Sequence, residues 1–363
     1  MNIGLYIHIP FCRKKCNYCD FYSVGGMQSV PAEYIRAVKR EIAARQPFTA
    51  ATVYFGGGTP SLLTPRQVAD ILGAVDIAAD AEITLEANPD TLTAEKLQGY
   101  RRAGVNRLSI GVQTVYNTSL ETLGRIHDAD KAALAFRWAK QAGFKNISGD
   151  LMIGLDNYSY EEMYATIDFL VQRGATHISA YMLKIEEGTP FYYNTPKNLA
   201  DEDRMADYYL AACKKMEEYG YHQYEISNFC LPGYHSRHNT IYWKLEDYLG
   251  IGPGAHSCMG GVRFYYPRDL QGFIAGGSTL EDGRVDADDY IMLSLRLKSG
   301  LDFSRLESQW GLVPNDYVKR KLEIYKRQNF VNYDGNTVSL TPTGFLAENI
   351  IASDIMSNVI YKE

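Results

Sequence analysis

Residues 4–19 read GLYIHIPFCRKKCNYC, a short strand-like run followed at once by three closely spaced cysteines. A second strand-like run, within TVYFGGGTP at residues 52–60, ends in a turn of three consecutive glycines. A segment with helical spacing of apolar residues follows each of these loops. Strands that alternate with helices predict parallel strands joined by right-handed crossovers.

The strand–helix rhythm continues through the first half of the chain. We predict strands at Gly4–Pro10, Thr52–Gly56, Glu82–Ala87, Arg107–Val112, Asn146–Ile153 and His177–Leu183. We predict helices at Pro31–Arg45, Pro65–Ala78, Thr93–Ala103, Ala129–Ala142 and Tyr160–Arg173. Six such units do not complete an eight-fold barrel, so the pattern indicates an α/β fold with either an open doubly wound sheet or a partial barrel.

Chemically distinctive residues lie at or close to the ends of these strands. Cys12 follows the first strand, the glycine turn at 56–60 follows the second, and Glu86, Gln113 and Asp150 belong to later ones. In both candidate folds, ligands collect at the carboxyl ends of the parallel strands. The recurrence therefore predicts one composite site at that edge of the sheet.

The rhythm changes from about residue 199. A helix is expected over Asp201–Tyr219, a strand-like run over Tyr224–Phe229, and a connection over Gly272–Gly283. Helices at Val285–Leu297 and Asp316–Arg327, a hairpin at Phe330–Leu340 and a helix after Pro342 complete the chain, an order similar to a winged helix. We therefore divide the chain into a core at 1–200, a continuation at 201–270 and a smaller, mainly helical domain at 271–363.

Composition narrows the classes of function. Of the 363 residues, 46% are hydrophobic and 22% charged, as in ordinary globular proteins, and the net charge is −6. This charge predicts no general affinity for nucleic acid. No stretch is apolar and long enough to span a bilayer, and residues 1–4 lead directly into a strand pattern instead of a secretory signal. We therefore expect a cytoplasmic protein.

Three cysteines, Cys12, Cys16 and Cys19, follow the pattern C-x3-C-x2-C. Thiolates are soft ligands, and a short loop lets several of them converge on one metal unit. Three ligands for four irons leave one iron free to bind a small chelating molecule. A zinc site would need a fourth ligand from elsewhere, for which Cys213, Cys230 and Cys258 are available, and inert core cysteines are a third interpretation.

The cysteine pattern after the first strand, together with Gly56-Gly57-Gly58-Thr59-Pro60 after the second, resembles the radical SAM superfamily. The resemblance covers about residues 3–190. It implies a partial (β/α)6 TIM-like barrel with a 4Fe–4S cluster on Cys12, Cys16 and Cys19, whose open iron is chelated by S-adenosylmethionine (SAM). It also implies a set of SAM contacts, namely Tyr6, Tyr18, Gly57, Gly58, Thr59, Glu86, Gln113, Arg125 and Asp150. In this interpretation Arg125 pairs with a carboxylate and Asp150 accepts from ribose hydroxyls.

Two further stretches, IHIPFC at 7–12 and CDFY at 19–22, resemble the oxygen-independent coproporphyrinogen oxidase group. That group includes HemN-type dehydrogenases and HemW-type heme chaperones, and the resemblance extends over nearly the whole chain. The dehydrogenases usually carry a fourth cysteine where this sequence has Phe21, and they have an extension before the cluster motif. Both departures favour the chaperone branch.

The sequence His238-Asn239-Thr240-Ile241-Tyr242-Trp243 fits HNxxYW, the heme motif proposed for the chaperone branch. An imidazole can ligate heme iron, and the rings of Tyr242 and Trp243 can pack on a porphyrin face. The alternative is a hydrogen-bonded core corner. His235 and His256 are weaker heme candidates, and the Gly-rich loop before His256 is expected to close the cofactor site or turn the chain.

Three functions follow from these resemblances. The first is a heme chaperone that binds heme or another tetrapyrrole, passes it to an acceptor protein and receives electrons from a reductant such as a flavodoxin. The second is an oxygen-independent coproporphyrinogen III dehydrogenase, and the third is a radical SAM methyltransferase. The sequence favours the first.

Overall fold

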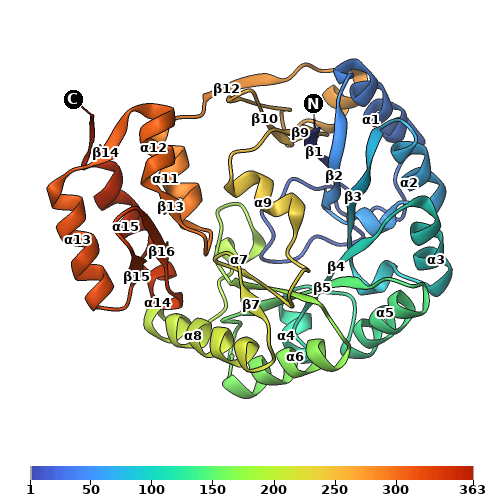
Figure 1. The fold of residues 1–363 in the computed structure, drawn as a ribbon. Coiled ribbons are helices and arrows are strands. Elements are labelled where there is room, and N and C mark those ends of the chain that lie inside the picture. Colours follow the sequence, from blue (N-terminus) through green and yellow to red (C-terminus); the bar gives the residue numbers. More distant parts are fainter. Residues whose placement is uncertain (1, 363) are drawn as a thin grey trace.

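The computed structural model describes residues 2–362, and its first half consists of six strand–helix units. The six strands are β1 (Asn2–Ile9), β2 (Thr49–Gly57), β3 (Asp76–Ala87), β4 (Arg107–Gln113), β5 (Asn146–Ile153) and β6 (His177–Met182). They pair in parallel in the order of the sequence, from β1 to β6. The sheet curls into a barrel-like shape (Figure 1). Because β1 and β6 do not pair with each other, the barrel is partial. The predicted α/β class and parallel order are confirmed.

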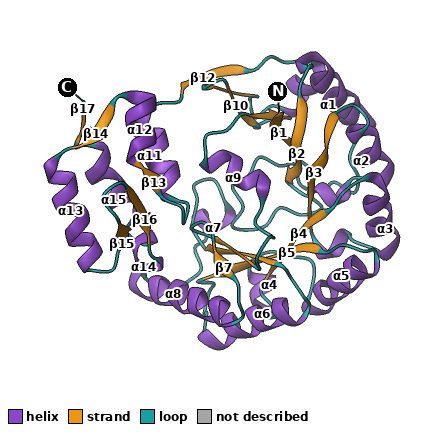
Figure 2. Ribbon diagram, in the orientation of Figure 1, coloured by secondary structure: helices purple, strands orange, loops and turns teal. Residues whose placement is uncertain are grey.

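Helices line the outside of this curved sheet, as Figure 2 shows. They are α1 (Ala32–Arg45), α2 (Pro65–Leu72), α3 (Ala94–Ala103), α4 (Asn117–Thr122), α5 (Ala129–Gln141) and α6 (Tyr160–Gln172), with short 3-10 turns η1 (Pro60–Leu62) and η2 (Pro89–Thr91). Side-chain caps start α2, α3, α5 and α6, and the cap of α2 is a reciprocal pair of Thr64 and Gln67.

Strand alternation separates an apolar outer layer from a polar interior. Leu5, Val53 and Leu85 are fully buried beneath the helices. The alternate residues, such as Tyr6 and Tyr54, face the barrel interior and contact one another there. The hydrophobic core therefore lies between sheet and helices, and the interior is left for polar groups.

Two helix predictions in the first half need correction. The segment predicted as one helix over Pro65–Ala78 ends at Leu72, and β3 begins at Asp76. Gly73 is the C-terminal cap of α2. The prediction ran past it because apolar periodicity alone does not show where the backbone becomes extended. The short α4 was not predicted, since six residues give too few turns for a periodic pattern.

The large sheet continues beyond the six units at both ends. Next to β1 lie β9 (Tyr248–Ile251), β10 (His256–Met259), β11 (Val262–Tyr265) and β12 (Leu280–Arg284), and next to β6 lie β8 (Asn228–Cys230) and β7 (His222–Gln223). The predicted connection at Gly272–Gly283 was wrong in part, because it contains most of α10 (Leu270–Ala275) and of β12. The four glycines of this segment suggested a loop, whereas β12 forms because it pairs with β11.

Two short helices and one long one complete this half. They are α7 (Pro190–Tyr193), α8 (Glu202–Glu218) and α9 (Arg237–Trp243). The predicted helix at Asp201–Tyr219 matches α8 closely. Figure 1 shows α9 on the open side of the barrel, between the sheet and the smaller domain.

The C-terminal part forms a separate lobe on the left of Figure 1. Its elements are α11 (Ala287–Leu295), β13 (Leu301–Asp302), α12 (Phe303–Trp310), β14 (Leu312–Pro314), α13 (Asp316–Arg327), β15 (Val331–Tyr333), β16 (Thr337–Leu340), α14 (Pro342–Phe345), α15 (Glu348–Met356) and β17 (Val359–Tyr361). Helices followed by the antiparallel pair β15–β16 give the winged-helix-like order that the sequence indicates. No helix within residues 2–362 combines the length and apolarity that crossing a membrane requires.

Candidate functional site

The three clustered cysteines lie on a loop that leaves β1 and folds back on itself. Both backbone polar groups of Cys12 are hydrogen-bonded. Its N–H donates to the carbonyl of Val24 at 2.9 Å, and its carbonyl accepts from the N–H of Met27 at 3.0 Å. The N–H of Asn17 donates to Leu123, which ties the loop to the segment after α4. As a result Cys12, Cys16 and Cys19 all line one cavity of about 370 Å³.

The walls of this cavity come from the carboxyl ends of successive strands, as the sequence indicates. Of the predicted SAM contacts, the structure brings eight together in the lining, namely Tyr18, Gly57, Gly58, Thr59, Glu86, Gln113, Arg125 and Asp150. Tyr6 is not among the lining residues. Its hydroxyl contacts His8 at 2.9 Å and its ring lies beside Tyr54, one layer below the cavity.

Two buried carboxyls form the acidic part of the cavity. Glu86 accepts from the Tyr54 hydroxyl at 2.8 Å and from the N–H of Gly57 at 3.2 Å, while burial raises its pKa to about 7. Asp150 accepts from Ser109 at 3.1 Å, and burial raises its pKa to about 6. The fully buried Arg107 counteracts burial at both groups. The carboxyls therefore change charge close to neutral pH.

Three residues of the cavity wall have unusual backbone or packing requirements. Gln113 has φ of 68°, an uncommon conformation for a non-glycine residue, and its buried Oε1 has no hydrogen-bond partner. Gly57 has φ of 110°, and a Cβ there would lie 2.5 Å from the His8 ring. A Cβ on Gly58 would lie 2.9 Å from backbone atoms of Ile9 and Phe11. Close packing thus requires glycine where the turn passes the cysteine loop.

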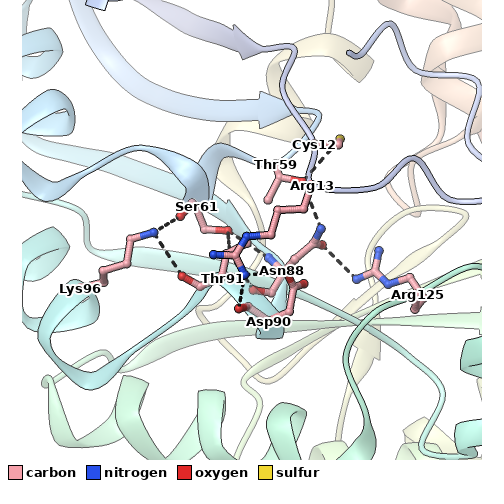
Figure 3. A network of polar contacts seen from close by, with 9 residues as sticks. All are labelled: Cys12, Arg13, Thr59, Ser61, Asn88, Asp90, Thr91, Lys96 and Arg125. Atoms are coloured by element: carbon pink, nitrogen blue, oxygen red, sulfur yellow. Dashed lines mark hydrogen bonds and ion pairs between the residues drawn. The ribbon is translucent and has the colours of Figure 1, made fainter. Parts of the chain in front are cut away.

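A network of hydrogen bonds connects this turn to two of the cysteines, and Figure 3 shows the part of it that links Cys12, Thr59, Asn88 and Arg125. Thr59 Oγ1 donates to Cys12 Sγ at 3.5 Å, and Arg125 Nη1 donates to Cys16 Sγ at 3.6 Å. Asn88 joins the two donors, since it bonds to Thr59 at 3.1 Å and to Arg125 at 2.9 Å. The sequence analysis missed Asn88, although it lies two residues after Glu86 and the strand-end rule could have found it.

The HNxxYW motif forms α9, and its histidine points into the barrel. His238 is 1% exposed, with Nδ1 2.6 Å from Thr52 Oγ1 and Nε2 2.7 Å from the Tyr242 hydroxyl. Burial lowers its pKa to about 3. The side chain of Glu82 accepts from the first N–H groups of α9, including that of His238 at 3.1 Å. None of His238, Tyr242 and Trp243 lines the cavity.

Several other sequence candidates are also located. Phe21 lines the cavity mouth and is 62% exposed. Cys213, Cys230 and Cys258 are buried on α8, β8 and β10 and lie outside the cavity lining. The Gly-rich loop before His256 turns the chain from β9 to β10, with positive φ at Gly252 and Gly254.

Comparison with known proteins agrees with this architecture. The family described as the Radical SAM superfamily matches residues 6–170, and the HemN C-terminal domain matches residues 285–347. A solved structure of coproporphyrinogen III oxidase (HemN) from Escherichia coli superposes with a TM-score of 0.81, covering 97% of this chain and 89% of that one, at 22% identity. The chain therefore combines a region that matches the Radical SAM superfamily with a HemN C-terminal domain, on a HemN-type fold.

Relatives with higher identity define the family more closely. A heme chaperone HemW from Bacillus subtilis is 35% identical over 95% of this chain and 96% of its own length. The heme chaperone HemW from Escherichia coli is 36% identical over 92% of this chain and 86% of its own length. The chain belongs to the HemW family.

Proposed function

We propose that this protein is a heme chaperone, which binds heme and passes it to an acceptor protein, and which carries a 4Fe–4S cluster and SAM in the cavity. The observation that carries the proposal is the similarity to proteins named heme chaperones along at least nine-tenths of the chain. The HemN-type structure by itself supports only the fold, because many functions share one fold.

The cluster is assigned to Cys12, Cys16 and Cys19. Their thiols share one cavity, whereas the remaining cysteines do not reach it, so three protein ligands are available and one iron stays open. Within residues 2–362 no three His, Cys, Asp or Glu side chains are gathered as they are around a single metal ion. Thiolates that bind separate irons of a cluster do not need such close gathering.

SAM is assigned to the strand-end side of the same cavity. When bound, cluster and SAM together supply one-electron chemistry at the sulfonium. Arg125 retains donors for a carboxylate beyond those given to Asn88, Gly111 and Cys16, and Asp150 is a ready acceptor for ribose hydroxyls. The unpartnered Oε1 of Gln113 is a further acceptor. Tyr6 supports the cavity floor in this proposal without touching the ligand.

Heme is assigned to α9, with His238 as the iron ligand and Tyr242 and Trp243 as packing residues. Both ring nitrogens of His238 are hydrogen-bonded and the side chain is buried. A porphyrin ring cannot reach it there, so binding requires α9 to move out of the barrel and the bond to Tyr242 to break. An electron donor such as a flavodoxin, a cytoplasmic location and the acceptor protein belong to the same proposal.

The test adds hemin to the purified protein under anaerobic conditions and records the Soret band. Wild type is expected to bind, His238→Ala to lose most of the band, and His235→Ala, a neighbouring exposed histidine, to bind like wild type. Loaded protein should then pass heme to a heme-free b-type cytochrome. Full binding by His238→Ala would remove the ligand assignment. Conversion of coproporphyrinogen to protoporphyrinogen by the reconstituted protein would replace the chaperone proposal with the dehydrogenase.

A further inference from the structure

The side chain of Asn88 joins the two sulfur-directed donors described above (Figure 3). Its Oδ1 accepts from Arg125 Nη2 at 2.9 Å, and its Nδ2 donates to Thr59 Oγ1 at 3.1 Å. From there Arg125 reaches Cys16 Sγ at 3.6 Å and Thr59 reaches Cys12 Sγ at 3.5 Å. One amide thus holds donors to two of the three cysteines without touching either sulfur.

The chemistry of the partners leaves only one orientation for this amide. A guanidinium donates and never accepts, so the amide oxygen must face Arg125. The amide nitrogen then faces Thr59 and donates to its hydroxyl oxygen. Because the hydroxyl has a single proton, that proton remains for Cys12 Sγ. The direction of every bond from Asn88 to the sulfurs follows from donor and acceptor counts.

The backbone of Asn88 is fixed by a closed ring of hydrogen bonds. Its N–H donates to Ser61 Oγ at 3.1 Å, and Thr91 Oγ1 donates to its carbonyl at 2.8 Å. Ser61 and Thr91 are themselves 2.5 Å apart at their hydroxyl oxygens, so the single proton of Ser61 completes the ring. The ammonium group of Lys96 donates to the backbone carbonyls of Ser61 and Thr91. These hydrogen bonds hold the backbone of Asn88 in place, and so they fix the position from which its side-chain amide extends.

We propose that Asn88 is a positioning residue for the iron–sulfur cluster, and that it sets the reduction potential of the cluster by orienting Thr59 and Arg125 toward the thiolates. The proposal rests on the assignment of the cluster to Cys12, Cys16 and Cys19. Hydrogen bonds to cluster sulfurs stabilise the reduced, more negative state and so raise the potential. Loss of the amide should lower it.

Two substitutions at position 88 separate this role from simple packing. Asn88→Ala releases both donors. Asn88→Asp keeps the volume but offers only acceptors, so the Thr59 proton turns to the new carboxylate and leaves Cys12. Thr59→Val removes one sulfur donor directly, and Thr59→Ser is the matched control that keeps it.

The experiment is an anaerobic redox titration of the reconstituted proteins, monitored by the EPR signal of the reduced cluster, with iron and sulfide content and circular dichroism measured alongside. We expect lower midpoint potentials in Asn88→Ala, Asn88→Asp and Thr59→Val, and the wild-type potential in Thr59→Ser. Asn88→Ala combined with Thr59→Val should shift no further than Asn88→Ala alone, because Asn88→Ala already disturbs the bond from Thr59 to Cys12 that Thr59→Val removes.

Wild-type potentials in both loaded Asn88 variants would overturn the proposal, and so would fully additive shifts in the double variant. If Asn88→Ala retains no cluster, the comparison of Thr59→Val with Thr59→Ser decides, because Asn88→Asp also adds a negative charge that lowers the potential by itself. If the assignment of the cluster to Cys12, Cys16 and Cys19 is wrong, the reconstituted wild-type protein will show no iron–sulfur absorbance. Heme binding plays no part in these measurements.

Discussion

The imidazole of His238 on α9 stacks on the phenol ring of Tyr54 on β2, with ring centroids 5.0 Å apart and planes inclined by 22°. The Tyr54 hydroxyl in turn donates to Glu86, which lines the cavity of the cysteines. One side chain, Tyr54, therefore lies between His238 and Glu86 of the proposed SAM site, although these two residues are 152 positions apart in the sequence. Substitution of Thr52, which bonds to His238, tests how firmly α9 is held, and substitution of Tyr54 tests the proposed SAM site.

Thr52→Val is expected to speed heme uptake. Thr52 Oγ1 lies 2.6 Å from His238 Nδ1, and valine has the same shape without the hydroxyl. Removal of one buried hydrogen bond weakens the hold on α9 by about 1 kcal/mol, which corresponds to about fivefold faster binding if α9 must leave the barrel first. Stopped-flow measurement of the Soret band gives the rate. Thr49→Val, on the same strand with its hydroxyl on Asp76, is the control, and an unchanged rate in Thr52→Val would exclude the opening of α9 as a rate-limiting step.

Tyr54→Phe is expected to weaken SAM binding near neutral pH. Burial raises the pKa of Glu86 to about 7, and the Tyr54 hydrogen bond opposes that effect. Without it the pKa rises further, and the carboxyl is more often neutral when it meets the positively charged ligand. Loss of a hydrogen bond to a charged group costs about 1.5–3 kcal/mol, so the affinity should fall at least about tenfold.

Calorimetric titration with SAM at pH 7 and pH 9 measures this effect on cluster-loaded protein. The difference between Tyr54→Phe and wild type should shrink at pH 9, where a larger share of the carboxyl is ionised in both proteins. Tyr158→Phe removes a buried hydroxyl that has no hydrogen-bond partner and should bind SAM like wild type. A loss of affinity that is independent of pH would point to packing instead of charge.

Gly58→Ala is expected to displace the cysteine loop. The added methyl group would lie 2.9 Å from three backbone atoms of Ile9 and Phe11, which cannot move without moving Cys12. Such overpacking costs about 1–3 kcal/mol of stability. We expect a lower melting temperature and a reduced iron content after reconstitution. Gly25→Ala in the same loop meets its nearest atom only at 3.7 Å and should load like wild type; equal iron contents in the two variants would contradict this account.

The strand-end rule accounts for most of what the sequence could predict about the site. It needs only the periodicity of the strands and the fact that parallel strands end at one edge, and it located Cys12, Glu86 and Asp150. The rule also places Asn88 at this edge, directly after β3. It cannot predict the hydrogen bonds of Asn88, because the partners Thr59 and Arg125 come from other units of the barrel. Hydrogen bonds between distant segments leave no periodic signal.

The buried, hydrogen-bonded state of His238 is one of the two interpretations that the sequence left open, and the sequence could not decide between them for the same reason. The seven residues of α9 are too few for a helical pattern, and their position depends on Glu82 and Thr52 on two other strands. Sequence analysis therefore identified the motif but not the side of the helix that faces the barrel. The strand β12 was hidden likewise, because the ladder with β11 stabilises it rather than its own composition.

Glu225 is expected to make the protein less stable as the pH rises toward neutrality. This carboxyl is 1% exposed, at the junction where residue 225 bridges Leu297 of the smaller domain, and burial raises its pKa to about 7 although Ser227 donates to it at 2.9 Å. The folded state therefore holds the proton more tightly than the unfolded state, whose pKa is about 4.5. The resulting stabilisation is complete below pH 4.5 and is lost as the pH rises to about 7.

Glu225→Gln removes this titration while keeping the shape of the side chain. Since one unit of pKa corresponds to about 1.4 kcal/mol, the free energy of unfolding of the variant should gain about 3 kcal/mol on wild type between pH 4.5 and pH 7.5. Urea unfolding across this range measures the difference, and Glu217→Gln on the exposed face of α8 should show no such trend. A constant difference between Glu225→Gln and wild type at all pH values would mean that the carboxyl is ionised throughout, held so by Arg296, which lowers its pKa against burial.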